Sequence, residues 1–395
     1  MLIFLFFFIS IIALVHFYLW QKLVNGIISN KKLKIVATVI LACLAVLIPA
    51  SMMISRQSDS TVFIRYFSFI PMTWLGFMML LFFFFAATDL ISLILKIITK
   101  LKSKKVKVSK DAIENPDRRD AFKKIAAVTA YSTIFPIGGF AVYNGMRKPT
   151  VIKKSLAINN FPEALNGFKI VQLTDLHLGL TIAGKWLNKV VEQVNMLNPD
   201  LVVITGDLID GEVSLLAGEV ESLTKLKSKH GVFFVTGNHE YYFGVEKWVN
   251  HLKTIGINVL LNENVKIGDN KDFFYLAGVN DHDAKRVSDK FVPDFDKALS
   301  GLSNDESVIL LAHQPAAVFE AEKFNVDLML SGHTHGGQIW PFNYLLPIRQ
   351  PYLKGLYRHN KKLQIYVNQG TGYWGPPMRL GTECEITEIT LNNGN

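Results

Sequence analysis

The chain has 395 residues, half of them hydrophobic, and a formal net charge of +9 at pH 7. Residues 1–150 carry 19 Lys and Arg against 6 Asp and Glu, whereas residues 151–395 carry 23 against 27. The basic residues of the first part flank long apolar runs, a pattern that favours lipid headgroups over nucleic acid as the partner. We therefore expect a membrane part followed by a separate domain, with the lipid bilayer and no nucleic acid as a partner.

Four apolar runs are about as long as the 20 residues that a membrane-spanning helix needs. They are roughly Leu2–Trp20, Ile35–Ile54, Phe67–Ala87 and Ile125–Tyr143. The first run lacks a basic start, and no small-residue cleavage site follows it, so we interpret it as an uncleaved span rather than a signal peptide. Residues 1–146 are thus predicted to form an N-terminal bundle of about four transmembrane helices.

Basic residues between these runs predict the orientation of the bundle. The first loop has four Lys between Lys22 and Lys34, and the third is dense in Lys and Arg from Lys96 to Lys124, whereas the second has only two basic residues. Since basic loops face the cytoplasm, the first and third are expected there, and the chain is expected to be a multi-pass protein of the cell (inner) membrane. The domain after residue 146 is then extracytoplasmic.

Two details of the chain add little to this interpretation. Asp89 follows the third run, and a helix that ends near Ala87 would leave its carboxylate at the membrane interface instead of deep in lipid. Cys43 lies in the second run and Cys384 near the C-terminus, so we expect no disulfide between them.

After a predicted linker at 147–165, short apolar runs alternate with helical periodicity. Buried strands are predicted in FKIVQLTDLHLG, LVVITGDLID, GVFFVTGNHE, FFYLAGVND, SVILLAHQP, VDLMLSGHTHGGQ, QIYVNQGTG and EITEITL, and helices in WLNKVVEQVNML and VEKWVNHLKTIG. This alternation predicts an α/β domain over 166–395, with helices on the faces of a largely buried sheet. In such folds ligands gather at the carboxyl ends of the strands.

Side chains that commonly bind metals stand at these strand ends. Carboxylate, amide and imidazole donors suit borderline divalent metals such as Mn, Fe and Zn. Each residue alone has an ordinary alternative, as a buried core histidine, a turn after glycine or a helix cap, but together they indicate one site. Seven ligands exceed what a single four-coordinate ion needs, and Asp207 is the natural bridge between two ions. The candidate ligands are Asp175, His177, Asp207, Asn238, His313, His333 and His335.

The blocks DLH, GD, GNHE, the lone His of LAHQP and GHTH, in this order, resemble the five signature blocks of the calcineurin-like metallophosphoesterases. The resemblance covers about residues 166–395, and the GHTHGGQ form is similar to the bacterial membrane-associated phosphodiesterase branch. It implies a four-layer α-β-β-α sandwich with a dinuclear metal centre. One departure is that the family's usual Pro-Glu pair near the C-terminus is replaced by Glu383–Ile386.

The resemblance also assigns the ligands. Asp207 would bridge the two ions, and His239 matches the family histidine that does not bind metal. Asp175, His177, Asp207 and His335 would hold one metal, and Asp207, Asn238, His313 and His333 would hold the other.

Two such cations lower the pKa of a shared water toward 7 and clamp phosphoryl oxygens for in-line attack by hydroxide. We expect His239 to stabilise the transition state or protonate the leaving oxygen. Asp210 is expected either to orient a ligand or to form a simple turn. Arg379 is expected either to pair with a phosphate oxygen or to be a surface charge.

The predicted function is hydrolysis of a phosphodiester or pyrophosphate bond in a lipid or nucleotide-like substrate by a membrane-anchored enzyme. The stretch IWPFNYLLPIRQPYLKGLY at 339–357 is either core plus a strand, or, if exposed, a surface that suits acyl chains or the bilayer. The alternative is a non-catalytic membrane sensor or scaffold that binds metal or a phospho-ligand. Such a protein would not need the proton donor His239.

Overall fold

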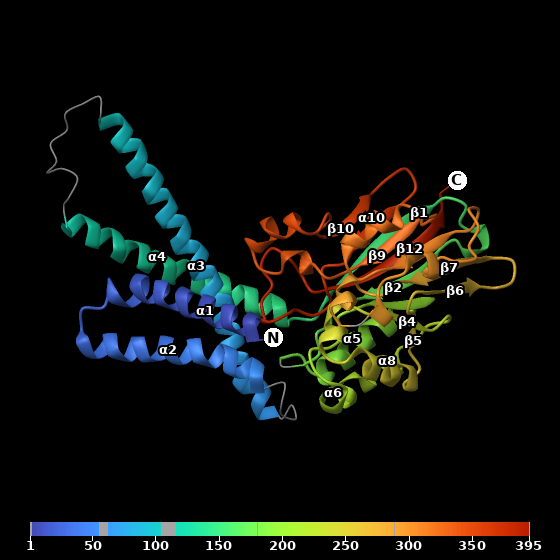
Figure 1. The fold of residues 1–395 in the computed structure, drawn as a ribbon, viewed down its shortest axis with the longest axis horizontal. Coiled ribbons are helices and arrows are strands. Elements are labelled where there is room, and N and C mark those ends of the chain that lie inside the picture. The colour runs from blue at the N-terminus through green and yellow to red at the C-terminus, as the bar shows by residue number, and fades with distance from the viewer. Residues whose placement is uncertain (1, 55–61, 104–115, 180, 288, 395) are drawn as a thin grey trace. The chain divides into compact units, whose positions relative to one another are not determined.

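The computed structural model describes residues 2–54, 62–103, 116–179, 181–287 and 289–394 (Figure 1). The chain divides into two compact units. We call residues 1–54 with 67–142 the helical unit, and residues 143–395, which group with 55–66, the sandwich unit. Arg56 and residues 104–115 of the third basic loop lie outside the described residues.

The sandwich unit contains two six-stranded sheets. The first has the order β1 (Thr150–Ile158), β12 (Glu385–Asn393), β2 (Phe168–Leu173), β3 (Leu201–Thr205), β4 (Val232–Val235) and β5 (Asn258–Val259). The second has the order β10 (Gly355–Arg358), β11 (Gln364–Val367), β9 (Leu328–Ser331), β8 (Val308–Leu311), β7 (Phe273–Gly278) and β6 (Glu263–Gly268). Strands β2 to β5 are parallel to one another, as are β7, β8, β9 and β11.

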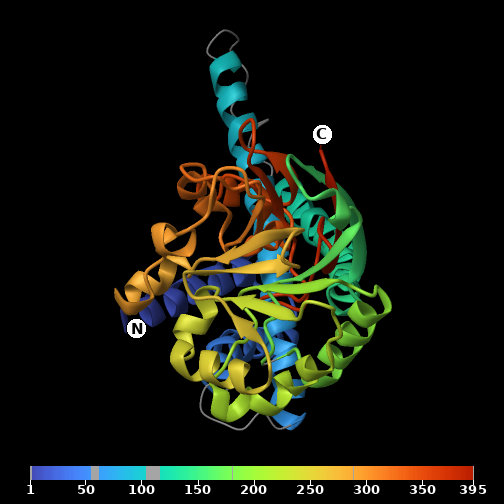
Figure 2. The ribbon, with the colours of Figure 1, turned by 90° about the vertical axis from the view of Figure 1, so that its right-hand side faces the viewer.

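Helices cover the outer faces of both sheets (Figure 2). Consecutive strand residues point to opposite faces, so in β2 Ile170 enters the core between the sheets while Val171 packs toward the helices. The predicted four-layer α-β-β-α sandwich is therefore confirmed. The first sheet packs against α5 (Gly184–Met196), α6 (Val213–Val220) and α8 (Val245–Thr254), and the second against α9 (Phe295–Ala298) and α10 (Val318–Ala321).

The segment 147–165 is more than the linker that the sequence predicts. It contains β1, which pairs in parallel with β12 from Thr150 opposite Glu385 to Ile158 opposite Asn393. The strand lies at the edge of its sheet, and its Lys153 and Lys154 are exposed. Edge strands commonly carry lysines that block further pairing, and this polar character hides the strand in the sequence.

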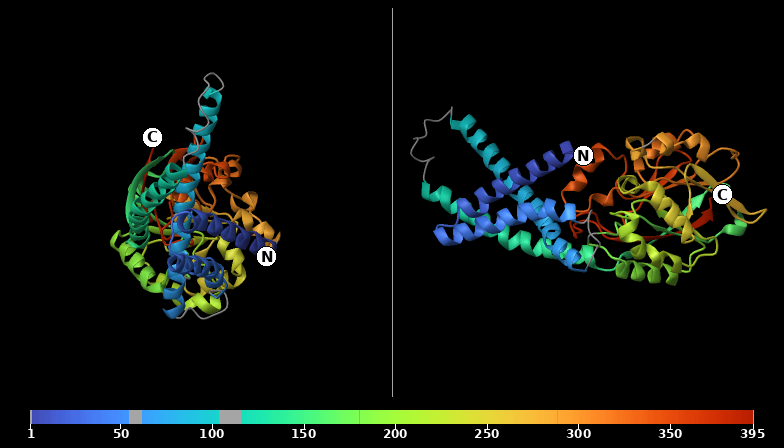
Figure 3. Two further views of the ribbon diagram at one scale, coloured as in Figure 1. Left: turned by 90° about the vertical axis from the view of Figure 1, so that its left-hand side faces the viewer. Right: turned by 60° about the horizontal axis from the view of Figure 1, so that its bottom comes forward.

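The helical unit has the four predicted helices, all long and apolar enough to cross a membrane. Helices α1 and α2 pack together (Figure 3). Between them, Trp20 Nε1 donates to Thr38 Oγ1 at 2.8 Å. Phe77 of α3 stacks on Phe135 of α4 with ring centroids 5.3 Å apart. The bounds are α1 Leu2–Trp20, α2 Lys31–Ile54, α3 Val62–Ser103 and α4 Pro116–Met146.

Helix α3 is longer than predicted. It continues for 42 residues to Ser103, so the expectation that it ends near Ala87 is wrong. The residues after Asp89, LISLILKIITK, are mostly apolar and free of glycine and proline, and nothing in them stops a helix. Within α3 the Asp89 carboxylate accepts from Lys22 Nζ at 2.5 Å and from Tyr18 OH at 2.7 Å.

Candidate metal centre

The seven candidate ligands follow the carboxyl ends of five strands, of which β2, β3 and β4 are parallel neighbours in the first sheet and β8 and β9 in the second. These ends meet at one edge of each sheet, so the short loops after the strands can place their side chains close together. Most of these side chains are buried, and the Asp175 carboxylate is fully so. Asp175 and His177 follow β2, Asp207 follows β3, Asn238 follows β4 at the start of α7 (Asn238–Tyr242), His313 follows β8, and His333 and His335 follow β9.

One group of donor atoms gathers Asp175, His177 and His335. The Nε2 atoms of His177 and His335 are 3.0 Å apart, and His335 Nε2 is 3.4 Å from Asp175 Oδ1. Asp207 Oδ2 lies 3.8 Å from His177 Nε2. Three donors from two loops therefore lie within 4.8 Å of one another, and an oxygen from a third loop lies beside them.

A second group gathers Asp207, His313 and His333. His313 Nε2 is 3.1 Å from Asp207 Oδ2 and 3.2 Å from His333 Nδ1. Nearby on the β4 loop, Asn238 Oδ1 is buried and accepts no hydrogen bond from any described residue. Asp207 Oδ2 lies beside both groups, as expected for an oxygen shared by two ions.

These donors fit divalent ions. Ligand atoms that bind one ion at about 2.0–2.2 Å lie roughly 3 Å apart, which matches the nitrogen–nitrogen distances of 3.0 and 3.2 Å. The opposite ring nitrogens of two histidines are engaged, since His177 Nδ1 donates to Asp210 Oδ1 at 2.9 Å and His313 Nδ1 to the Thr205 carbonyl at 2.7 Å. Their Nε2 lone pairs are thereby free to bind metal.

The backbone around the ligands is held in unusual conformations. Five of the seven residues have positive φ, a region that non-glycine residues rarely adopt and that clusters at functional sites. Glycines permit the close approach of neighbouring loops, since a Cβ at Gly237 would overlap Asp207, and one at Gly332 would overlap Asp175 and Thr174. The five residues are Asp175 (51°), His177 (47°), Asp207 (52°), His333 (69°) and His335 (51°).

Glu240 is a positioning residue that sequence reasoning missed. Its Oε2 accepts from the backbone N–H groups of Asp207 (3.1 Å) and Gly237 (2.7 Å), and its Oε1 from that of Leu208 (2.9 Å). The buried carboxylate thus ties the bridging aspartate to the β4 loop. The signal was present in GNHE, because glutamate three residues after an N-terminal cap is the capping-box spacing.

His239 lies beside both groups and is oriented by Asp210. His239 Nδ1 donates to Asp210 Oδ1 at 2.5 Å, so that one carboxylate holds both His239 and the ligand His177. The other nitrogen, Nε2, is 3.9 Å from Asp207 Oδ2. Burial alone would lower the pKa of His239, but the carboxylates of Asp207 and Asp210 raise it to about 9. The ring is thereby poised as a proton donor at neutral pH.

Arg379 is placed differently from the sequence expectation. Its side chain is fully buried, and its guanidinium donates to the carbonyls of His335 (2.7 Å), Gly370 (3.2 Å) and Gly372. Neither the predicted phosphate contact nor a surface charge agrees with this burial. Burial and then the adjacent guanidinium lower the pKa of His335, which keeps its ring in the neutral form that binds metal.

Trp374 forms part of the wall next to His239, with ring centroids 5.9 Å apart. The Gln338 side chain holds the backbone of Trp374 with two hydrogen bonds. Its Nε2 donates to the Trp374 carbonyl at 2.8 Å, and its Oε1 accepts from the Trp374 backbone N–H at 2.9 Å. Gln338 is the last residue of GHTHGGQ, so the loop that carries two ligands also positions this exposed indole. Nothing in the sequence near GYWG pointed to that role.

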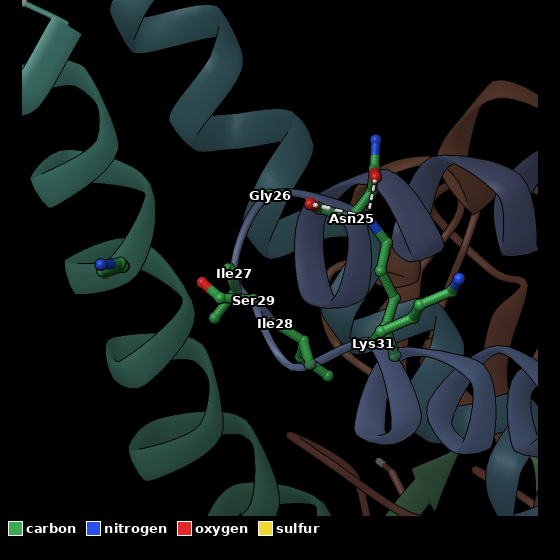
Figure 4. Close-up of a pocket in the computed structure, with 8 residues that line it drawn as sticks. Asn25, Gly26, Ile27, Ile28, Ser29 and Lys31 are labelled. Atoms are coloured by element: carbon green, nitrogen blue, oxygen red, sulfur yellow. Dashed lines mark hydrogen bonds between the residues drawn. The ribbon is translucent and has the colours of Figure 1, made fainter.

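A separate cavity of about 470 Å³ lies within the helical unit (Figure 4). Its lining includes the turn between α1 and α2, Lys31 and Lys34 of α2, and Lys124 of α4. Lys34 Nζ donates to Asn25 Oδ1 at 2.5 Å. Basic residues of the first and third predicted loops therefore line the same pocket, which agrees with the prediction that these two loops share one side of the membrane.

Comparisons with known proteins show what this chain is similar to. A family model for calcineurin-like phosphoesterases matches residues 168–337. The chain is 32% identical over 401 residues to a Danio rerio protein named transmembrane protein with metallophosphoesterase domain, covering 98% of this chain and 89% of that one. It is 39% identical over 277 residues to an uncharacterized metallophosphoesterase of Helicobacter pylori, covering 70% and 73%.

Among solved structures, the NAD nucleotidase of Haemophilus influenzae is similar at 18% identity, with a TM-score of 0.37 over 52% of this chain and 50% of that one. The sequence relatives come from both bacteria and animals and are matched over most of their length. This chain belongs to the calcineurin-like phosphoesterase family.

Proposed function

We propose that this chain is a membrane-anchored hydrolase that uses two divalent ions to cleave a phosphodiester or pyrophosphate bond. The observation that carries the proposal is the position of Asp207 Oδ2 beside both donor groups, 3.8 Å from His177 Nε2 and 3.1 Å from His313 Nε2. A shared carboxylate oxygen is what a pair of ions needs and a single ion does not. Members of this family are phosphoester hydrolases.

Two divalent ions, when bound, supply Lewis acidity for the phosphoryl oxygens and lower the pKa of water toward neutrality. The residues of the chain hold and orient the reacting groups. Asp210 accepts the hydrogen bond from Nδ1–H of His239, which leaves Nε2–H directed toward the centre, where it can donate to the leaving oxygen. Arg379 and Glu240 keep the ligand loops in place through backbone contacts.

The helical unit supports membrane anchoring in this proposal. Its four helices are long and apolar enough to span a bilayer, and the Danio rerio relative is named a transmembrane protein. Tethering next to lipid raises the local concentration of a membrane substrate. We therefore propose a lipid or nucleotide-like phosphoester as the substrate class, with Mn, Fe or Zn as the ions.

Hydrolysis of an aryl phosphodiester by the full-length protein in detergent, with Mn²⁺ added, tests the reaction. Asp207→Ala should abolish turnover and reduce the bound metal measured by elemental analysis. Asp269→Asn, at a fully exposed carboxylate in the turn between β6 and β7, is the matched control and should leave both unchanged. The proposal fails if the wild-type protein shows no metal-dependent turnover on a panel of phosphoesters, or if Asp207→Ala retains full activity.

We also propose that the sandwich unit is extracytoplasmic, because the basic loops of the helical unit are expected in the cytoplasm. A fluorescent protein that folds only in the cytoplasm, fused after Asn395, should be dark, and alkaline phosphatase fused there should be active. A bright fluorescent fusion would reverse the orientation.

A further inference from the structure

Exposed large apolar side chains are few in the sandwich unit, and they are not scattered evenly. Among the described residues after Arg147, six of ten lie between residues 340 and 374. Ile348 is 81% exposed and Tyr344 69%. We call residues 339–354 the apolar loop, which joins the GHTHGGQ turn to β10. The six exposed residues are Trp340, Tyr344, Leu345, Ile348, Leu356 and Trp374.

The charge of this region sets it apart from the rest of the unit. Residues 339–358 contain no Asp or Glu and three basic residues, Arg349, Lys354 and Arg358. Residues 151–395 as a whole carry 23 basic against 27 acidic side chains. Exposed Trp and Tyr, aliphatic tips and flanking basic residues without acidic ones form the pattern of surfaces that bind anionic membranes.

The apolar loop is held at several points by residues close to the ligands. Thr334, between the two histidines of GHTH, donates from Oγ1 to the Leu353 carbonyl at 2.6 Å. Gln350 Nε2 donates at 3.3 Å to Oε1 of Gln314, which follows the ligand His313. The loop is therefore a built part of the site, and its apolar tips remain exposed although its ends are fixed.

One of the six exposed residues, Trp374, borders the predicted proton donor. Trp374 packs against His239 with ring centroids 5.9 Å apart and is clamped by Gln338, two residues before Trp340. A lipid that touches this surface would therefore have its headgroup next to the donor groups of the metal centre.

The short connection between α4 and β1 favours a bilayer as the partner of the apolar loop. Helix α4 ends at Met146 and β1 begins at Thr150, so three residues join an apolar helix of spanning length to the first strand of the sandwich unit. Three extended residues reach about 10 Å. A bilayer spanned by α4 is therefore covalently tied to the sandwich unit, which favours it over a separate partner as the surface that covers the apolar loop.

We propose that the apolar loop inserts Tyr344, Leu345 and Ile348 into the surface of an anionic bilayer, and that the substrate is a phosphoester in the headgroup region of that bilayer. The insertion stands on exposure, charge and connectivity, and the substrate class rests on the proposed hydrolase function. The basic residues Arg349 and Lys354 contact lipid phosphates, while the apolar side chains enter the acyl boundary.

Site-specific quenching tests the insertion without requiring catalysis. A fluorophore is attached to Ile348→Cys, or to the control Met196→Cys, in full-length protein that carries Cys43→Ala. Met196 lies on α5 and is 71% exposed, which makes it a matched apolar position outside the loop. In nanodiscs of phosphatidylcholine and phosphatidylglycerol with brominated chains, position 348 should be quenched and position 196 should not. Equal quenching at both positions, or none at 348, would overturn the proposal.

The substrate class is tested by the ratio of two activities. In the same nanodiscs, turnover of a phospholipid phosphodiester is compared with turnover of a water-soluble aryl phosphodiester. The double substitution Leu345→Asp with Ile348→Asp should lower this ratio about tenfold, because charged side chains do not enter the acyl boundary, and Met196→Asp should not change it. An unchanged ratio contradicts the lipid substrate. If wild-type protein turns over neither the phospholipid nor the aryl phosphodiester, the proposed hydrolase function is refuted. The insertion of the apolar loop is then decided by the quenching result alone.

Discussion

The two units of this protein differ in where their apolar side chains lie: many are on the surface of the helical unit, whereas most are in the interior of the sandwich unit. In the helical unit apolar side chains face outward, as with Phe17 and Val46, which are 60% and 66% exposed, whereas in the sandwich unit Ile170 and Phe234 are fully buried. Among the described residues, 33 large apolar side chains are exposed before Arg147 and ten after it. This difference is what we expect if lipid surrounds the helical unit and water the sandwich unit, because lipid accepts apolar surface that water excludes.

Ionisable side chains differ in the opposite way: Asp89 of the helical unit is partly exposed, whereas those of the candidate metal centre are buried. In the helical unit a carboxylate such as Asp89 is partly exposed and is bonded to Lys22 and Tyr18. In the sandwich unit buried carboxylates and imidazoles converge at one edge, where a metal pair would compensate their burial. The comparison supports a division in which the proposed chemistry belongs to one unit and the proposed membrane contact chiefly to the other, with the apolar loop as the proposed exception.

Removing the predicted proton donor should have the largest effect. His239→Asn is expected to slow hydrolysis of an aryl phosphodiester by about 10²–10⁴-fold, the usual scale of acid catalysis. Bound metal, measured by elemental analysis, should remain at the wild-type level because His239 is not a predicted ligand. An unchanged rate would remove the role assigned to His239, and lost metal would make it a ligand.

Asp210→Asn should have a smaller effect of a different kind. Asp210 accepts hydrogen bonds from Nδ1 of His177 and of His239, so its loss should weaken metal affinity about 10–100-fold, as for other residues that orient ligands. A titration with Mn²⁺ followed by activity gives the apparent affinity. Wild-type affinity in this variant would show that Asp210 only forms a turn.

Arg379→Met separates the structural role from the phosphate contact expected from sequence. Three carbonyls and the His335 ring would lose a buried donor, so the free energy of unfolding should fall by about 3 kcal/mol or more. Thermal unfolding in detergent measures this change. Arg358→Met, at an exposed arginine of β10, is the control and should leave the melting temperature unchanged. Wild-type stability with a raised KM would restore the phosphate contact.

The smallest effect is expected in the helical unit. Asp89→Asn weakens partly exposed bonds to Lys22 and Tyr18, and Asp89 belongs to the unit that carries none of the predicted ligands. Turnover of a soluble aryl phosphodiester should stay within about twofold of wild type. A large loss of this activity would mean that the two units are coupled, and the division of roles between them would not hold.

Much of the architecture was predictable from sequence. Most buried strands of the sandwich are short apolar runs, and each ligand follows such a run closely enough to be recognised in DLH, GD, GNHE, LAHQP and GHTH. The four helices were predictable because uninterrupted apolar runs of about 20 residues are typical of membrane-spanning helices. In both cases the signal is local, since it depends on residues that are neighbours in the chain.

Local patterns also caused the errors. Strand β1 resembles a linker because edge strands tolerate lysines, and the limit of α3 was set by an average span length instead of by a helix-breaking residue. Arg379 resembled a phosphate ligand because the sequence does not reveal its burial under His335. The role of Trp374 depends on a contact with Gln338, 36 residues earlier in the chain.

The amino-acid sequence by itself determined which residue types stand at the ends of the strands, and therefore that a metal-binding edge and an apolar helical region exist. Only the tertiary structure decided that Asp207 Oδ2 lies beside both donor groups, that Asp210 holds both His177 and His239, and that the apolar loop is exposed. The physical reason is that periodicity and composition report on a residue's own environment. A distance between two side chains depends on how separate strands and loops pack.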